Sequence, residues 1–236
     1  MNSVLERVYE IGIIPVIAFN SVDEAIPLCK ALMDGGLPAA EVTFRTACAE
    51  ECIKKIHEEL PNMLLGAGTV LTVDQADRAM AAGASFIVAP GFDPEVCKHV
   101  IDKGGIMMPG TATSGEMQQA MNMGCEVVKF FPAEANGGVD KLKNIGAALK
   151  TCKWMCTGGV NAKNVNNYLG YNQIIAVGGT CGHIAILTNN VDRAIYHLSQ
   201  RGVKFDMDSK NVKDGKTIAI YFADEVAGFA IHLVQK

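Results

Sequence analysis

Short apolar runs rich in β-branched residues recur along the chain, and segments with helical periodicity lie between them. The apolar runs are Ile13–Phe19, Ala39–Phe44, Met63–Val70, Phe86–Pro90, Ile106–Pro109, Glu126–Phe131, Trp154–Thr157 and Ile174–Val177. The helical segments are Val22–Met33, Ala47–Leu60, Val73–Ala82, Pro94–Ile101, Gly115–Met123, Val139–Leu149 and Ala162–Leu169. Strands that alternate with helices indicate parallel βαβ units.

Eight such units before about residue 200 predict an α/β fold, specifically a (β/α)8 TIM barrel over residues 1–200. A doubly wound open sheet is the alternative. It is disfavoured because no G-x-G-x-x-G motif follows the first apolar run, as a dinucleotide-binding sheet would require. Active-site residues of a barrel gather at the carboxyl ends of its strands, so the last residues of each run are the place to look for chemistry.

Residues 201–236 extend beyond the predicted barrel and form a short β-rich extension. Strands are expected at Val203–Phe205, Thr217–Phe222 and Gly228–Val234, with a hairpin turn at Asp214-Gly215-Lys216. Together with the Val191–Gln200 helix and the apolar run 183–187, this tail resembles one βαβββ module of the glyoxalase (vicinal-oxygen-chelate) kind. The resemblance offers only His183 and His232 as metal ligands, so we expect a small sheet that packs on the barrel or builds an oligomer contact.

Composition fits a globular protein, with 49% hydrophobic and 19% charged residues and a net charge of −4. No Lys/Arg-rich run is present, which argues against nucleic acid and anionic membrane as partners. Met1–Glu10 lacks the apolar core of a signal peptide, and no apolar stretch approaches the roughly 20 residues of a membrane span. The eight cysteines form no C-x-x-C pair, so we expect reduced thiols and a cytoplasmic location.

Lys129 stands inside the apolar segment Val127-Val128-Lys129-Phe130-Phe131-Pro132. A buried amine must find a partner or lose its proton, and a neutral lysine amine is a nucleophile that forms Schiff bases with carbonyl compounds. The alternative is a lysine at a strand end whose stem packs on the core while its head reaches water.

Other strand ends also carry polar groups. Strand alternation places Glu41, Thr43 and Arg45 on one face, which would point into a barrel. The alternative reading of this face is a buried Glu–Arg ion pair that closes the barrel. Glycine pairs end the seventh and eighth runs, and their small size lets backbone N–H groups approach a phosphate. These runs end in Thr157-Gly158-Gly159 and Gly178-Gly179-Thr180.

The segment from Lys129 to Gly138, KFFPAEANGG, resembles the lysine motif of bacterial 2-keto-3-deoxy-6-phosphogluconate (KDPG) aldolases. Three further segments resemble the same family in its order and spacing, namely Glu41–Thr46, Gly66–Val70 and Thr157–Gly159. The family also includes 4-hydroxy-2-oxoglutarate (KHG) aldolases, and the resemblance covers roughly residues 5 to 200. It implies a small-molecule 2-keto acid substrate, the Entner-Doudoroff pathway and a homotrimer.

Carried over by position, the resemblance implies that Lys129 forms the Schiff base and that Glu41 shuttles protons. The iminium then serves as the electron sink, so no metal or other cofactor is needed. The five histidines lie outside the matched motifs. The remaining matched positions imply contacts with the substrate, at its carboxylate (Arg45, Thr69), its chain (Pro90, Phe131, Thr157) and its phosphate (Gly158, Gly159, Gly179, Thr180).

One departure from the family lies after the eighth run, where Thr180-Cys181 stands in place of the usual Ser-Trp. A threonine hydroxyl can replace that of serine, but the changed shape favours a substrate without phosphate, such as KHG. Two alternatives to an aldolase remain. The first is a phosphate-binding barrel of another kind, either an isomerase or a sugar-phosphate binder. The second is an interaction protein that binds through its tail. Only an aldolase requires the amine of Lys129.

Overall fold

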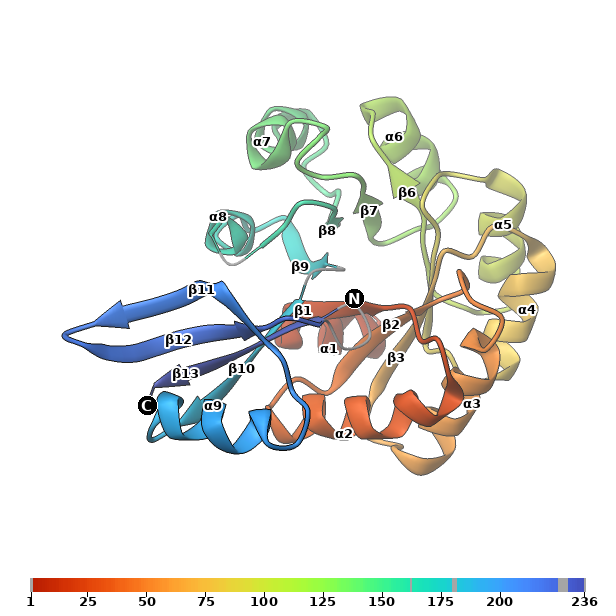
Figure 1. Ribbon diagram of the computed structural model, residues 1–236. Helices are drawn as coiled ribbons and strands as arrows, with labels where there is room; N and C mark the ends of the chain where they lie inside the picture. Colours follow the sequence, from red (N-terminus) through yellow and green to blue (C-terminus); the bar gives the residue numbers. More distant parts are fainter. Residues whose placement is uncertain (1, 162, 180–181, 225–228, 236) are drawn as a thin grey trace. The chain divides into compact units, whose positions relative to one another are not determined.

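The computed structural model describes residues 2–161, 163–179, 182–224 and 229–235. The chain divides into two compact units, Met1–Gly179 and Thr180–Lys236, which are described separately (Figure 1). In the described residues, no helix is both long and apolar enough to cross a membrane.

The first unit is built on a parallel sheet with the strand order β5-β4-β3-β2-β1-β9-β8-β7-β6. Its strands are β1 (Ile13–Ile17), β2 (Ala39–Thr43), β3 (Leu64–Gly68), β4 (Phe86–Val88), β5 (Met107–Met108), β6 (Gly110–Thr111), β7 (Val128–Phe130), β8 (Trp154–Thr157) and β9 (Ile174–Gly179). Sequence neighbours β5 and β6 form the two ends of this order, so the sheet curls into a near-closed barrel. All eight predicted runs are strands, and the predicted barrel is confirmed. The fifth run is split at Pro109, which has no N–H group to donate.

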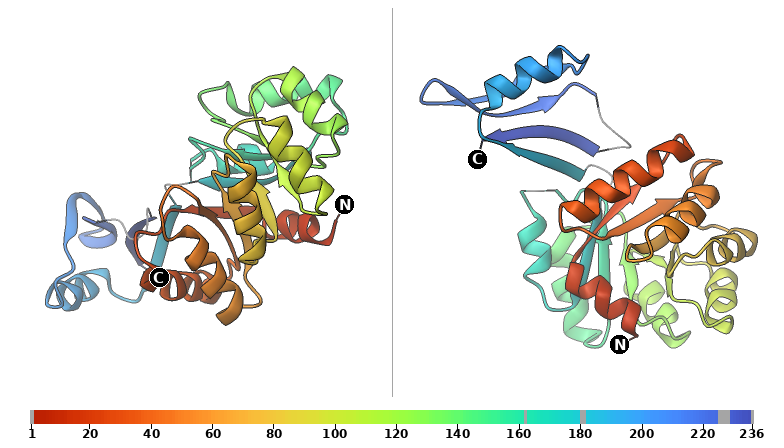
Figure 2. Two further views of the ribbon diagram at one scale, coloured as in Figure 1. Left: turned by 90° about the vertical axis from the view of Figure 1, so that its right-hand side faces the viewer. Right: turned by 90° about the horizontal axis from the view of Figure 1, so that it is seen from below.

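Helices surround this sheet on the outside, except the first, which packs against the apolar residues at one end of the barrel (Figures 1 and 2). They are α1 (Ser3–Ile11), η1 (Val22–Glu24), α2 (Ala25–Asp34), α3 (Ala49–Glu59), α4 (Val73–Ala81), α5 (Pro94–Asp102), α6 (Ser114–Asn122), α7 (Gly138–Ala148) and α8 (Val165–Leu169). Local capping fixes several starts. Thr113 and Glu116 form a reciprocal capping box at α6, and Asp93 accepts two backbone N–H bonds at α5, where Pro94 follows it.

Apolar side chains fill one end of the barrel, and buried polar side chains line the other. Phe86, Met108, Val127 and Met155 belong to a single buried cluster, into which α1 inserts Leu5 and Val8. The carboxyl ends of the strands instead bury a polar set consisting of Glu41, Thr43, Thr111, Lys129 and Thr157. In this architecture the active site lies at the carboxyl ends of the strands, above a barrel interior filled with side chains.

The second unit is a four-stranded sheet with one helix. Its elements are β10 (Gly182–Thr188), α9 (Val191–Ser199), β11 (Phe205–Lys213), β12 (Lys216–Phe222) and β13 (Phe229–Gln235), in the strand order β10-β13-β12-β11. The predicted βαβββ order is confirmed, and so is the hairpin, where Asp214 and Gly215 adopt positive φ angles of 51° and 75°. The strand predicted at Val203–Phe205 is wrong in its bounds, because β11 begins at Phe205. Val191 of α9 packs with Ile220 and Leu233 in a small core.

The predicted domain boundary at residue 200 falls inside this second unit. Strand β10 pairs with β13 in parallel, from Gly182 opposite Phe229 to Thr188 opposite Gln235. Residues 182–199 therefore belong with the C-terminal sheet, and the correct division lies between Gly179 and Thr180. The side chains of His183 and His232, the metal-ligand candidates considered above, lie outside the described part of the structure.

Candidate active site

Lys129 on β7 and Glu41 on β2 meet inside the barrel, and their Nζ and Oε1 atoms are 3.4 Å apart. Lys129 is 5% exposed and Glu41 is fully buried. The reading in which the lysine head reaches water is therefore wrong. The alternative of a Glu41–Arg45 pair is also wrong, because the described partner of Glu41 is Lys129. Two charges this deeply buried are rare unless they are paired.

Small neighbours make room for the glutamate. Glu41 lies opposite Gly66 on β3, and Thr43 lies opposite Gly68. A Cβ atom on Gly68 would stand 2.1 Å from Oε1 of Glu41, so only glycine fits there. The second carboxylate oxygen of Glu41 is buried and has no hydrogen-bond partner among the described residues. That oxygen is available to a molecule bound in the barrel mouth.

Arg45 lies just beyond β2 and is exposed at the rim. Its Nε atom donates a hydrogen bond to Oγ1 of Thr43 at 3.1 Å, and this hydroxyl donates to the carbonyl of Ile17 at 3.0 Å. The chain of hydrogen bonds ties the guanidinium to two neighbouring strands. Its remaining donors are suited to a carboxylate, which a guanidinium binds in a bidentate manner.

Further groups fix the lysine. The Nζ atom of Lys129 lies 5.1 Å from the centre of the Phe131 ring, which is half-buried. The Thr111 hydroxyl, on β6, donates to the backbone carbonyl of Lys129 at 3.0 Å. Thr111 was not among the predicted site residues. Its only signal in the sequence is its place two residues beyond the fifth run, which does not show that its hydroxyl bonds to the lysine strand.

The turn after β8 presents backbone groups rather than charged side chains. Gly158 and Gly159 have φ angles of 99° and 82°, which favour glycine. In the described residues, no acceptor is paired with the N–H group of either glycine. Beside them, the Oγ1 atom of Thr157 is buried without a described partner. These groups lie at the place where barrels commonly bind phosphate.

The other predicted contact residues lie at the same rim. Thr69, half-buried with a φ angle of 56°, directly follows β3. Pro90 is half-buried just beyond β4, and Gly179 is the last residue of β9. The predicted phosphate contact Thr180 lies outside the described residues. The strand ends thus place the remaining predicted contacts around the mouth that holds Lys129 and Glu41.

The other groups with possible chemistry are the cysteines and the side chains that can bind metals. Burial raises the pKa of Cys29 and of Cys152 to about 12, which keeps these thiols protonated and unreactive. Among the residues described, no three His, Cys, Asp or Glu side chains are grouped so that they could hold a metal ion.

A near-closed (β/α)8 barrel with a buried lysine–glutamate pair at its strand ends defines the class of Schiff-base-forming barrel enzymes. Within that class the chain belongs to the KDPG and KHG aldolase family, whose model matches residues 4–196. The match ends inside α9, so the last three strands of the second unit lie beyond it.

Individual relatives agree with the family. A 2-dehydro-3-deoxy-phosphogluconate aldolase of Treponema pallidum is 41% identical over 180 residues, covering 76% of this chain and 86% of the relative. A KHG/KDPG aldolase of Escherichia coli K12 is 37% identical over 168 residues, covering 71% of this chain and 79% of the relative. The crystal structure of KDPG aldolase from Legionella pneumophila superposes with a TM-score of 0.72 at 36% identity, covering 74% and 85%. That structure holds pyruvate captured at low pH as a covalent carbinolamine intermediate.

Proposed function

We propose that this protein is a class I aldolase that forms a Schiff base on Lys129. Its reaction is cleavage of KDPG to pyruvate and glyceraldehyde 3-phosphate, of KHG to pyruvate and glyoxylate, or of both. The observation that carries the proposal is the buried Lys129–Glu41 pair, with 3.4 Å between Nζ and Oε1. It is supported by relatives named for both substrates. The reaction belongs to the Entner-Doudoroff pathway.

In the first half of the reaction, the neutral amine of Lys129 attacks the C2 carbonyl of the substrate and forms a carbinolamine. Glu41 delivers a proton to the departing hydroxyl, and water leaves to give the iminium. Glu41 is close enough to receive the proton of the amine and to return it to oxygen. Its second oxygen, which has no described partner, can accept a hydrogen bond from the substrate hydroxyl.

In the second half, the carboxylate of Glu41 takes the proton from the C4 hydroxyl. The C3–C4 bond breaks, its electron pair moves into the iminium, and the aldehyde leaves. The resulting enamine takes a proton at C3, and water then releases pyruvate from Lys129. Each step balances with protons and water alone.

The rim residues bind the two ends of the substrate. Arg45 holds the carboxylate, and Thr69 supports that end. Phe131 and Pro90 provide apolar walls and Thr157 contacts the substrate chain. The N–H groups of the glycine turn hold the phosphate. The residues proposed for this phosphate contact are Gly158, Gly159, Gly179 and Thr180.

Borohydride trapping with pyruvate tests the chemistry directly. Peptide mass spectrometry is expected to find the reduced pyruvate adduct on Lys129. Lys141 serves as an internal control, because its Nζ atom also lies over an aromatic ring, 5.8 Å from the centre of Phe130. A folded protein without an adduct on Lys129 would sink the aldolase proposal, and the glycine turn would then indicate a phosphate-binding barrel of another kind.

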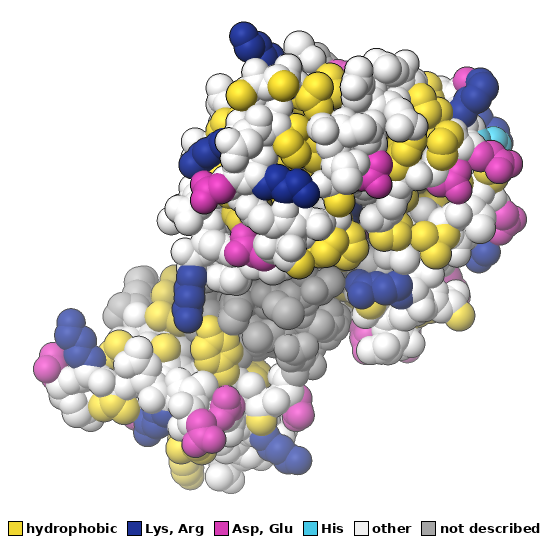
Figure 3. All heavy atoms as spheres, turned by 90° about the horizontal axis from the view of Figure 1, so that it is seen from above, with side chains coloured by type: hydrophobic (Ala, Val, Ile, Leu, Met, Phe, Trp, Pro, Cys, Tyr) yellow, Lys and Arg dark blue, Asp and Glu magenta, His cyan; other side chains and the backbone are white. Residues whose placement is uncertain are grey.

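We further propose that the protein works in the cytoplasm as a homotrimer and that nucleic acid and membranes are not its partners. On the face seen in Figure 3, acidic and basic side chains of the described residues are interspersed rather than gathered by sign. The homotrimer is what the resemblance to the family implies. Light scattering after size exclusion tests it, and deletion of the whole second unit, Thr180–Lys236, tests whether this unit contributes to the assembly.

A further inference from the structure

The loop after the lysine strand is bonded directly to the glycine turn. The N–H of Ala133 donates to the carbonyl of Thr157 at 2.8 Å, and the N–H of Glu134 donates to the carbonyl of Gly158 at 3.0 Å. A Cβ atom on Gly159 would stand 2.6 Å from Cβ and 2.7 Å from Cγ of Glu134. The stem of Glu134 therefore lies against the face of Gly159, and the position of this side chain constrains the turn.

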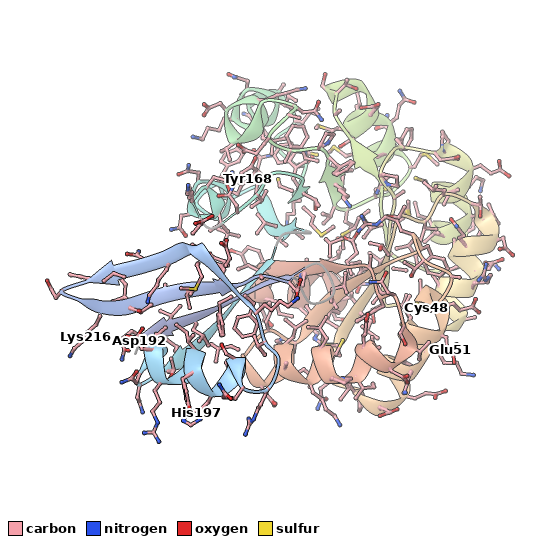
Figure 4. All side chains as sticks on the ribbon, viewed as in Figure 1. Cys48, Glu51, Tyr168, Asp192, His197 and Lys216 are labelled. Carbon is pink, nitrogen blue, oxygen red and sulfur yellow. The ribbon has the colours of Figure 1, made fainter. Side chains whose placement is uncertain are left out.

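Tyr168 holds the other end of Glu134. This tyrosine lies on α8 (Figure 4) and is 1% exposed. It donates its hydroxyl hydrogen to Oε1 of Glu134. Burial, with the neighbouring carboxylate of Glu134, raises the pKa of Tyr168, so its hydroxyl remains a donor at all physiological pH values. A cavity of about 560 Å³ beside α7 and α8 is lined by both residues.

Two asparagines that precede α8 also bond to the turn. The side-chain amides of Asn161 and Asn164 each donate to the carbonyl of Gly159 at 3.0 Å, and Asn164 is the N-cap of α8. The backbone that follows Gly159 continues to α8, and Tyr168 on α8 donates a hydrogen bond to Glu134. The stem of Glu134 in turn lies against Gly159. This closed arrangement, formed by Gly159, Asn164, Tyr168 and Glu134, is named the tyrosine brace below.

We propose that Tyr168 is a positioning residue, which holds Glu134 and thereby fixes the Gly158–Gly159 turn where the phosphate end of the substrate binds. This inference rests on the proposed function for the identity of the ligand. Two effects follow if the hydroxyl is removed. The turn loses one of its restraints, and the Glu134 carboxylate becomes free to swing beside an anion that it repels. Lys129 and Glu41 are not members of the tyrosine brace, and they bond to each other rather than to it, so the chemical steps are expected to change little.

The test compares the full-length protein with its Tyr168→Phe variant, which keeps the buried ring and removes only the hydroxyl. The KM for KDPG is expected to rise about 5- to 10-fold, the effect of one hydrogen bond. The kcat should stay within about 2-fold, and the KM for KHG, which has no phosphate, should not change. Tyr171→Phe is the matched control, because that hydroxyl donates to Gln173 at 2.6 Å and lies outside the brace.

A double-mutant cycle shows whether the two brace residues act together. Glu134→Ala removes the restraint on Gly159 together with the repelling carboxylate, so it is expected to raise the KM for KDPG about as much as Tyr168→Phe. The double variant should match Glu134→Ala, because residues that act as one unit are not additive. Calorimetric titration of inorganic phosphate gives a second readout that does not depend on turnover. The Kd should rise by a similar factor in both single variants and stay unchanged in Tyr171→Phe.

An unchanged phosphate Kd in Tyr168→Phe, or a wild-type protein that binds no phosphate, overturns the inference. Parallel losses for KDPG and KHG also overturn it, because they indicate a general loss of structure. Failure of the proposed function looks different. Pyruvate would then leave no adduct on Lys129, while the shifts in phosphate Kd would still support the tyrosine brace.

Discussion

The candidate site has two halves that are built from different parts of the polypeptide. In the lysine half, buried charged side chains carry the function, namely Lys129 and Glu41. In the glycine half, Gly158 and Gly159 present backbone N–H groups, and the nearby side chains hold the backbone in place. Reaction and recognition thus depend on separate structural features, and substitutions should be able to damage one while sparing the other.

Burial also affects the two halves differently. A buried charge that loses its partner is strongly destabilising, so the two members of the lysine half depend on each other. The glycine half depends instead on its backbone conformation and on the close approach of neighbouring side chains to the glycines. Gly159 is exposed, yet it cannot carry a side chain without meeting Glu134. Substitution of Lys129 or Glu41 is therefore expected to reduce kcat, and substitution of the glycine half to raise KM.

The largest expected effect comes from Lys129→Arg. A guanidinium keeps the positive charge beside Glu41 but stays protonated, so it cannot attack a carbonyl. We expect kcat to fall by more than about 10³-fold and trapping with pyruvate to disappear. Circular dichroism should show a folded protein, and Lys141→Arg should behave as the wild type does. Residual cleavage near the wild-type rate would show that Lys129 is not the Schiff-base lysine.

The next effect comes from Glu41→Gln, which preserves shape and removes the carboxylate. Because Glu41 transfers protons in several steps, kcat is expected to fall about 10²- to 10³-fold. The amine remains, so pyruvate should still be trapped on Lys129, only more slowly. Rapid-quench experiments measure the rate of trapping on Lys129 separately from kcat. If trapping vanished while the protein stayed folded, Glu41 would be needed for the amine itself rather than for proton transfer.

Gly159→Ala tests the glycine half. The φ angle of 82° costs about 1 kcal/mol for alanine, and the new methyl group would also meet Glu134. The KM for KDPG is expected to rise about 10-fold with kcat little changed. Gly104→Ala is the matched control, because its φ angle is 76° and nothing lies within 4 Å of the added carbon. Equal KM values in the two variants would mean that the contact with Glu134 has no part in binding.

The lysine half could be predicted from the sequence and the tyrosine brace could not. A lysine within an apolar run is a local signal, and strand alternation places Glu41 inward. The eight strands are local patterns too. By contrast, Tyr168 and Glu134 are 34 residues apart, and neither position shows a periodicity that points to the other. The boundary was missed for the same reason, because β10 has an ordinary strand pattern and only its pairing with the distant β13 assigns it to the second unit.

Added salt is expected to produce the smallest effect, and this effect should distinguish the glycine half from the lysine half. Screening shortens the Debye length from about 10 Å at 0.1 M to about 3 Å at 1 M ionic strength, and it acts mainly on exposed groups. The glycine half lies at the rim, and its proposed ligand is a multiply charged phosphate, whereas Lys129 is 5% exposed. Steady-state kinetics across this range should show the KM for KDPG rising about 2- to 3-fold, with kcat constant and a smaller change in the KM for KHG. If both substrates respond equally, the salt-sensitive contact is the one they share, between Arg45 and the carboxylate, and the glycine half does not discriminate between them by charge.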